Sequence, residues 1–196
     1  MQRPPGARGW LRTLGVDHMT THLLKLVAVI IAVCIPGLAF GEDKTVPKTQ
    51  IREAYFTINL PKGWIGGPGS DSTLWQYASP KQNEQLSVSI HISKTPISKQ
   101  ERPKILNDFL AMRLKSETDQ AKSKSFKISE PTKEEKGNAW VARYSGVHPE
   151  ARRRFANFTV VNPKLIANFY YEALDMTEEE FEKNRKQILT GVGVAE

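Results

Sequence analysis

The segment from Arg153 to Leu174 constrains the fold more than any other part of this sequence. It consists of two runs of β-favouring residues joined by Asn162-Pro163, a dipeptide that is typical of turns. Along both runs apolar side chains recur at every second position, the period of a strand with one buried face. These apolar positions are Phe158, Val160, Leu165, Ala167, Phe169 and Tyr171. The segment therefore predicts a β-hairpin around which the remaining elements pack.

The cleanest alternation in the chain lies in residues 86–93. Apolar side chains alternate there with the polar side chains of Ser87, Ser89, His91 and Ser93. The pattern predicts a strand with one buried and one polar face, as in an antiparallel sheet that is open to solvent on one side or lines a wet groove.

The remaining periodicities complete the element order β-β-β-α-β-β-β-β-α. Few βαβ crossovers fit this order, so we expect an α+β fold with a mostly antiparallel sheet packed by helices. Helix starts are indicated by Pro103 in a first turn, and by Thr177 with Glu180, which together form a capping box. The further expected strands are 55–60, 73–78, 126–128 and 138–146, and the expected helices are 101–116 and 177–189.

Three stretches are predicted to lie outside the regular elements. They are a glycine-rich loop at 65–71, a charged turn at 131–137 and a tail after Gly191.

Residues 1–41 have the pattern of a secretory signal peptide. Lys25 precedes the apolar run Leu26–Ile35, and small residues at Ala39 and Gly41 favour cleavage before Glu42. The apolar run is shorter than the roughly 20 residues of a membrane-spanning helix. We expect an exported, periplasmic protein, with an uncleaved anchor in the inner membrane as the alternative. Residues 42–50 are predicted to be a flexible lead-in, and residues 51–196 a single domain.

Charge and cysteine content exclude several classes of function. The leader carries four of the 28 basic and one of the 21 acidic side chains, which leaves 24 and 20 and a net charge of +4. This balance is too weak to indicate a nucleic-acid partner. The single cysteine, Cys34, lies in the leader, so the mature domain has no thiol for a disulfide, thiolate catalysis or a thiolate-bound metal.

Several segments resemble the PsbP-like group, which includes the bacterial DcrB-like proteins. They are FTINLPKGW at 56–64, the strand at 86–92 before a single long helix, and residues 166–171 leading to 177–189. The resemblance covers nearly all of 51–194 and implies an antiparallel sheet between helices, an α/β/α sandwich. It also implies protein binding rather than catalysis, since some bacterial members look like accessory, chaperone or immunity proteins of type VI secretion. The exported leader favours a role in the envelope.

Two features are candidate binding sites. Arg152, Arg153 and Arg154 with His148 form a cationic corner beside the hairpin that could grip a carboxylate or phosphate, or could be a solubilising edge. Trp64 follows a turn and precedes the glycine-rich loop, so its indole could anchor a partner or pack under the loop.

Catalytic signals are sparse in the mature chain. Its two histidines, His91 and His148, lie in no HExxH motif, and the chain has no GxSxG elbow or phosphate loop. His91, beside Ser89 on the polar strand face, is a candidate ligand-facing or pH-sensitive group, and a plain solvated histidine is the alternative. We expect no metal site and no cofactor. A hydrolase using His91 and a carboxylate is the least favoured hypothesis.

These observations favour a non-catalytic, exported protein-binding module of the bacterial envelope. Its more specific form is an immunity or accessory protein for a secreted effector. The alternative is a periplasmic protein that binds a small ligand or an anionic lipid through the polar strand face and the arginine corner. No nucleic-acid partner is expected.

Overall fold

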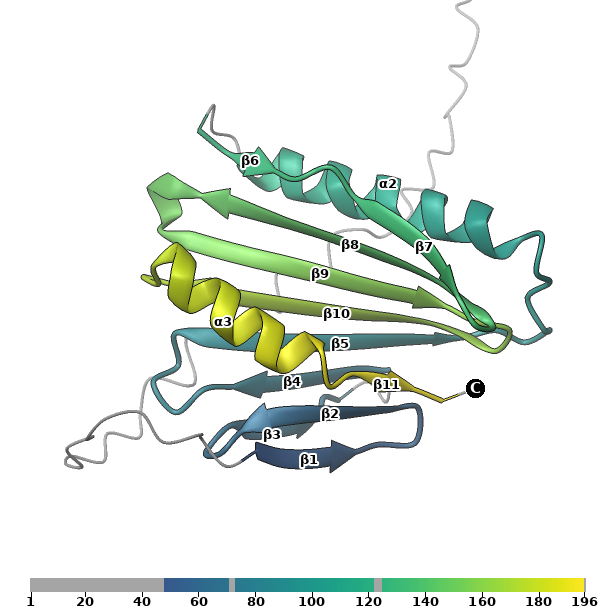
Figure 1. Cartoon of the computed structure of the whole chain (residues 1–196), viewed down its shortest axis with the longest axis horizontal. Coiled ribbons are helices and arrows are strands. Elements are labelled where there is room, and N and C mark those ends of the chain that lie inside the picture. Colours follow the sequence, from purple (N-terminus) through teal and green to yellow (C-terminus); the bar gives the residue numbers. More distant parts are fainter. Residues whose placement is uncertain (1–47, 71–72, 122–124, 196) are drawn as a thin grey trace, which may run out of the picture. The chain divides into compact units, whose positions relative to one another are not determined.

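The computed structural model describes residues 48–70, 73–121 and 125–195, and the expected hairpin lies in the middle of its main sheet (Figure 1). The hairpin consists of β9 (Arg153–Val161) and β10 (Leu165–Leu174), which pair antiparallel. Asn162 closes the turn, because its Oδ1 accepts hydrogen bonds from the backbone N–H groups of Lys164 and Leu165, each at 2.9 Å.

The main sheet has eight strands, all of which pair antiparallel. Its order is β3-β4-β5-β10-β9-β8-β6, and β7 also pairs with β8. The expectation of an antiparallel sheet is therefore confirmed. The strands besides the hairpin are β3 (Ile65–Pro68), β4 (Leu74–Ala78), β5 (Glu84–Ile92), β6 (Lys127–Ile128), β7 (Thr132–Lys136) and β8 (Ala139–His148).

Two of these strands replace segments that the sequence predicts as irregular. β3 lies in the expected loop at 65–71 and β7 lies in the expected charged turn at 131–137. Gly66 allows β3 to pair closely, because a Cβ atom at that position would come within 2.0 Å of the carbonyl oxygen of Gln76. β7 has no buried residue, and its Glu134 carboxylate lies 2.6 Å from Arg143 on β8. Neither strand has the alternating apolar pattern on which the prediction relied.

A second, three-stranded sheet has the order β1-β2-β11. Its strands are β1 (Lys48–Arg52), β2 (Phe56–Pro61) and β11 (Gly193–Val194). β1 begins inside the stretch predicted as a flexible lead-in, and β11 lies in the predicted tail. The expectation of one sheet was wrong in this respect, since β2 pairs with these short strands rather than with the main sheet.

Two long helices cover opposite faces of the main sheet (Figure 1). The first, α2 (Arg102–Ala121), packs across β8 and β9 and ends beyond the predicted boundary at residue 116. The second, α3 (Glu178–Leu189), begins with the predicted capping box, in which Thr177 and Glu180 exchange hydrogen bonds. With the short 3-10 helix η2 (Pro149–Ala151), these elements confirm the α+β sandwich.

The hydrophobic core is divided by the main sheet. On the α3 side, β2, β4, β5, β9, β10 and α3 bury a large apolar cluster that includes Phe56, Trp75, Val88, Phe169 and Phe181. On the α2 side, the buried apolar residues are Ile97, Leu106, Leu110, Ala142, Tyr144, Phe155 and Val161. Met112 of α2 is 57% exposed.

The predicted leader at 1–41 and residues 42–47 lie outside the described residues. Within the described ranges, no helix combines the length and apolar composition that a membrane span requires.

Candidate functional site

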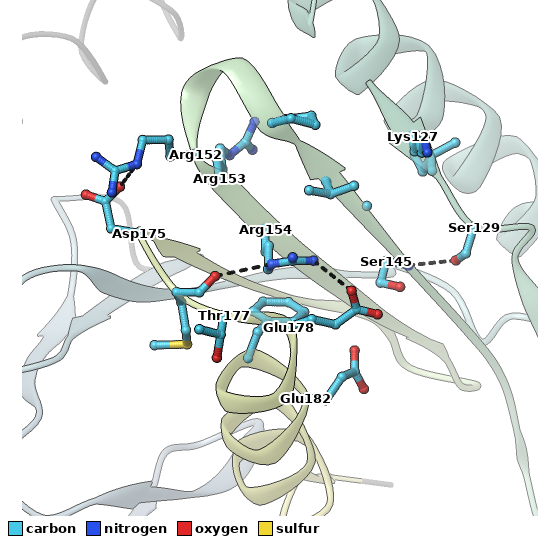
Figure 2. Close-up of a pocket in the computed structure, with 16 residues that line it drawn as sticks. Lys127, Ser129, Ser145, Arg152, Arg153, Arg154, Asp175, Thr177, Glu178 and Glu182 are labelled. Carbon is cyan, nitrogen blue, oxygen red and sulfur yellow. Dashed lines mark hydrogen bonds and ion pairs between the residues drawn. The ribbon is translucent and has the colours of Figure 1, made fainter. Parts of the chain in front are cut away.

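A groove of about 850 Å³ lies where β6 and β8 meet the beginning of β9 and of α3 (Figure 2). We call it the arginine groove. It is lined by Lys127, Ile128, Ser129, Ser145, Gly146, Val147, Pro149, Arg152, Arg153, Arg154, Asp175, Met176, Thr177, Glu178, Phe181 and Glu182. The hairpin thus positions the predicted arginine run at one end of the sheet, beside the capped start of the last helix.

Arg152 lies at the rim of the groove. It follows η2 and adopts a left-handed backbone conformation with φ of 51°. Its Nε lies 2.6 Å from Oδ1 of Asp175, and both side chains are more than half exposed. Ion pairs this exposed contribute at most about 1 kcal/mol, so a ligand carboxylate or phosphate can replace Asp175 at little cost.

Arg154 lies deeper in the groove (Figure 2). Its Nε donates to the backbone carbonyl of Met176 at 3.3 Å, and its Nη1 lies 3.6 Å from the carboxylate of Glu178. The Glu178 side chain is 79% exposed, whereas that of Arg154 is 26% exposed. The guanidinium is therefore held by the backbone and faces a carboxylate that is free to move away.

The remaining lining of the groove combines apolar and polar groups. Phe181 of α3 is buried, and Val147 of β8 is partly exposed. Ser129 and Ser145 are joined by a hydrogen bond of 2.9 Å from the backbone N–H of Ser145 to the Ser129 hydroxyl. The Lys127 side chain is exposed, and no hydrogen bond or ion pair joins its ammonium to another described residue. The groove offers an apolar patch surrounded by exchangeable charges.

Arg153 is directed to the opposite face of the sheet, toward α2. Its Nε donates to Glu172 at 2.9 Å, and its Nη2 contacts Glu117 at 3.4 Å and also the Tyr170 hydroxyl. Burial by itself would lower the pKa of Arg153, but Tyr170, Glu172 and Glu117 outweigh it and raise the pKa. Arg153 is consequently a structural cation that holds α2 against the hairpin.

His148 also departs from the expected cationic corner. Its Nε2 lies 3.0 Å from the backbone carbonyl of Ala121 at the end of α2, and its ring packs beside Phe126. The predicted corner is therefore divided, with Arg152 and Arg154 at the groove and His148 and Arg153 on the α2 side. Sequence reasoning could have found this division, because successive side chains of a strand point to opposite faces.

Two other predicted site residues lie on the polar face of β5. Ser89 is partly exposed, and His91 is exposed with its ring beside Phe109 of α2. No hydrogen bond or ion pair in the described part of the chain joins His91 to a carboxylate, so the hydrolase hypothesis gains no support. Likewise, no group of three His, Cys, Asp or Glu side chains among the described residues could hold a metal ion.

Trp64 does not line the arginine groove, and it directly precedes β3 at the edge of the main sheet. It follows Gly63, whose φ of 92° makes the turn after β2, and it is partly buried against the α3-side core. This packing corresponds to the structural alternative that the sequence left open for Trp64.

Sequence reasoning missed three residues that shape this region. Glu117 of α2 is buried, and Tyr170 and Glu172 of β10 complete its network with Arg153. Burial raises the pKa of the Tyr170 hydroxyl above its usual range. One feature of the sequence could have indicated this network: Glu172 places a charge inside an otherwise apolar strand, on the same strand face as Tyr170.

Comparisons with known proteins define the fold class. No family model matches the sequence, and no curated protein is significantly similar to it. The structure is similar to the solution structure of cyanobacterial PsbP (CyanoP) from Synechocystis sp. PCC 6803, with a TM-score of 0.56 and 14% identity over 80% of this chain and 98% of that chain. The chain therefore has a PsbP-like fold.

Two further solved structures are similar at lower scores. One is LpqN of Mycobacterium tuberculosis, described as involved in cell envelope biogenesis, with a TM-score of 0.49, 14% identity and coverage of 76% of this chain and 91% of that chain. The other is the Ran-binding protein Mog1p of Saccharomyces cerevisiae, with a TM-score of 0.44, 10% identity and coverage of 76% and 96%. The fold assignment rests on CyanoP, and a DcrB-like relationship and a link to type VI secretion stay predictions.

Proposed function

We propose that this protein is a non-catalytic binding module that takes a segment of another protein in the arginine groove. The observation that carries the proposal is the composition of the groove. The partly exposed Val147 lies in the same groove as Lys127, Arg152 and Arg154, and the buried Phe181 packs beneath this lining. Protein interfaces combine an apolar centre with a polar rim in the same way, and arginine is enriched in them.

The charges at the rim indicate what the partner segment carries. The carboxylates of Asp175 and Glu178 are exposed, and each occupies one guanidinium of the groove. A partner carboxylate can displace either one, while an apolar side chain next to it covers Val147. We therefore expect a partner segment in which acidic and apolar residues alternate.

The test compares partners captured by the full chain and by groove variants in the native host. Val147→Glu places a charge in the apolar patch, and Lys127→Glu reverses an exposed cation. Lys186→Glu, at an exposed position near the other end of α3, is the control, because it makes the same charge change as Lys127→Glu. We expect one protein to be retained by wild type and Lys186→Glu but lost by Val147→Glu, and the purified partner to bind the Val147→Glu variant at least about tenfold more weakly. Identical partner sets for all four proteins would contradict the proposal.

A second candidate function is the binding of a small anion or an anionic lipid. It is favoured by the convergence of Lys127, Arg152 and Arg154 on one groove. Phosphate, citrate and vesicles that contain phosphatidylglycerol are suitable probes for thermal shift and flotation. Stabilisation of wild type that is lost in Lys127→Gln would support this function, and no stabilisation by any probe would count against it.

We further propose that the protein is exported and acts in the periplasm. The charged and apolar pattern of residues 1–41 supports this proposal. Cell fractionation with N-terminal sequencing tests it, since cleavage predicts a soluble chain that begins at Glu42. A chain that keeps its leader and sediments with the inner membrane would identify the anchored alternative.

The more specific role is that of an immunity or accessory protein for a secreted effector. It rests on the resemblance to PsbP-like proteins and on the export pattern. Co-expression with the product of a neighbouring secretion gene tests it. Growth rescue by wild type but not by Val147→Glu is the expected result, and equal growth without the protein would contradict the role.

A further inference from the structure

Three buried polar atoms between α2 and the main sheet have no hydrogen-bond partner among the described residues. They are Nε of Arg113 on α2, the hydroxyl of Tyr144 on β8 and Oδ1 of Asn157 on β9. The residues Tyr144 and Asn157 are only 3% and 1% exposed. Native proteins rarely leave a buried polar atom in this state, because its lost hydration is not replaced. Each of the three atoms therefore requires a partner.

The strand register and a ring contact bring these atoms into one region. Asn157 lies in the middle of a row across the sheet, opposite Tyr144 on one side and Tyr170 of β10 on the other. Opposite side chains of antiparallel strands have Cβ atoms about 5 Å apart. The guanidinium of Arg113 lies over the Tyr170 ring, 5.2 Å from its centroid. The helix thus places Arg113 above the row that contains the other two groups.

The electrostatics of Tyr144 show the same proximity. Burial raises the pKa of Tyr144 to about 12, and the nearby Arg113 guanidinium opposes this rise. In the described part of the chain, however, no hydrogen bond reaches the Tyr144 hydroxyl. The two groups are therefore close without being hydrogen-bonded to each other, as is expected where one small molecule lies between them.

The neighbouring polar groups are already engaged. Asn157 Nδ2 donates to the Thr159 hydroxyl at 2.8 Å, and the Tyr170 hydroxyl and the carboxylate of Glu117 both contact Arg153. Turning the Asn157 amide over would leave a buried donor in place of the buried acceptor. Exchanging the two ends of this amide consequently does not remove the need for a partner.

The three atoms together select the molecule that can satisfy them. Arg113 Nε can only donate a hydrogen bond and Asn157 Oδ1 can only accept one, whereas the Tyr144 hydroxyl can do either. A carboxylate could not donate to Asn157, and a metal cation could not accept from Arg113. Water does both, and buried waters typically form about three hydrogen bonds.

We propose that one water molecule is buried between α2 and the main sheet. It accepts a hydrogen bond from Arg113 Nε, donates one to Asn157 Oδ1 and forms a third with the Tyr144 hydroxyl. The surroundings are closed, since Leu110 of α2 belongs to the same buried cluster as Tyr144 and is 2% exposed. None of the three bonding residues lines the arginine groove, so the inference is independent of the proposed binding function.

The first test is the sign of a stability change in Tyr144→Phe, which removes only the hydroxyl. If water bonds this hydroxyl, the variant loses a hydrogen bond, and its equilibrium constant for unfolding should be about fivefold larger than that of wild type. If the hydroxyl has no partner, its removal relieves a desolvation cost. Denaturant titrations measure the difference, and a variant as stable as wild type or more stable would overturn the proposal.

The second test counts long-lived internal waters of the 196-residue chain by ¹⁷O magnetic relaxation dispersion. The double variant Arg113→Met/Tyr144→Phe leaves only Asn157 to hold the water, so its count should be lower than that of wild type by a single molecule. Its two-dimensional NMR spectrum checks that it folds.

The matched control is Tyr77→Phe. Tyr77 is 2% exposed on the α3 side and its hydroxyl contacts Glu53 at 3.4 Å, so its loss should leave the count unchanged. A crystal structure of wild type should show a water within hydrogen-bond distance of all three atoms. An unchanged count in the folded double variant, or direct hydrogen bonds among the three side chains in the crystal, would overturn the proposal.

Discussion

The two faces of the main sheet are packed by different chemistry. On the α3 side, the buried residues of β5 and β10 are aliphatic or aromatic, and Phe169 has aromatic contacts to Phe56 and Phe158. On the α2 side, the buried residues include Glu117, Asn157, Thr159 and Asn168. The same two strands, β9 and β10, therefore contribute an apolar face on the α3 side and a mixed face, with both apolar and polar buried residues, on the α2 side.

This difference indicates which face of the main sheet contributes most to the stability of the domain. Burying a large apolar side chain stabilises by about 1.5–3 kcal/mol, whereas buried ion pairs and amides often break even against their own desolvation. The α3 side therefore supplies most of the stability. On the α2 side, the buried polar side chains are held in fixed orientations, because a hydrogen-bonded network tolerates only one arrangement of its members.

The largest expected effect comes from the apolar face. Phe169→Ala removes a fully buried ring and should lower the free energy of unfolding by about 3–5 kcal/mol. Phe109→Ala on α2, where the ring is partly exposed beside His91, should cost only about 1 kcal/mol. Denaturant titrations of both variants measure the contrast. Equal losses would show that the two faces contribute alike.

The next effect tests the ion pairs under α2. Glu117→Gln keeps the shape of the side chain but removes a buried charge that faces Arg113 and Arg153. We expect a loss of about 2 kcal/mol, the contribution of hydrogen bonds to charged groups. Asp119→Asn, which breaks the exposed pair with Lys115 on the same helix, should cost less than about 0.5 kcal/mol. A Glu117→Gln variant as stable as wild type would show that these ion pairs do not stabilise the packing of α2.

A smaller effect is expected in the buried hydrogen-bonded chain of Asn157, Thr159 and Asn168. Thr159→Val is nearly isosteric but removes the hydroxyl that joins Asn157 to Asn168. Leaving both amides with one partner fewer should cost about 1 kcal/mol in unfolding experiments. A stabilised variant would mean that desolvation of the three polar groups outweighs their hydrogen bonds. Val160→Thr on the opposite face makes the reverse exchange of a methyl for a hydroxyl in an apolar environment and is the reference.

The smallest effect is electrostatic and lies at the start of α3. The hydrogen bonds from Thr177 hold the pKa of Glu180 below its ordinary value of 4.5. A lowered folded-state pKa means that the stabilising contribution is present above the unfolded pKa and is lost as pH falls through the lowered value. The melting temperature should therefore decrease from about pH 5 downward, and less steeply in Glu180→Gln than in wild type.

The control for this pH dependence is Glu179→Gln, in the same first turn but without a described partner. Its acid profile should follow that of wild type. Identical profiles for all three proteins would assign the acid sensitivity to other carboxylates, such as that of Glu134, whose pKa is lowered by its hydrogen bond from Arg143.

Much of the fold could be predicted because its main elements have local signals. The hairpin turn at Asn162, the alternation in β5 and the capping box of Thr177 each act within a few residues, and all were found in the structure. β1, β3 and β11 could not be predicted, because short strands without alternation are stabilised mainly by the partner with which they pair.

The candidate site was predicted only in part. The arginine run was correctly located beside the hairpin, but Arg153 and Arg154 face opposite sides of β9. Only the packing of α2 and α3 onto those two sides shows which guanidinium joins the network of Glu117 and Glu172 and which lines the groove. The contribution of Met176 and Phe181 to that groove depends on contacts between residues distant in sequence.

By itself the sequence determined the identity and direction of the hydrogen-bonding and apolar groups along each strand, since alternation and capping depend on neighbours one to four residues away. The tertiary structure decided which polar groups are paired and which are left open. That outcome depends on strand register and on how much of each sheet face a helix covers. Arg153 and Arg154 are adjacent in the chain and similarly exposed, at 23% and 26%, yet one is paired with carboxylates on the α2 side and the other lines a groove on the α3 side, because the helices packed on the two sheet faces supply their partners.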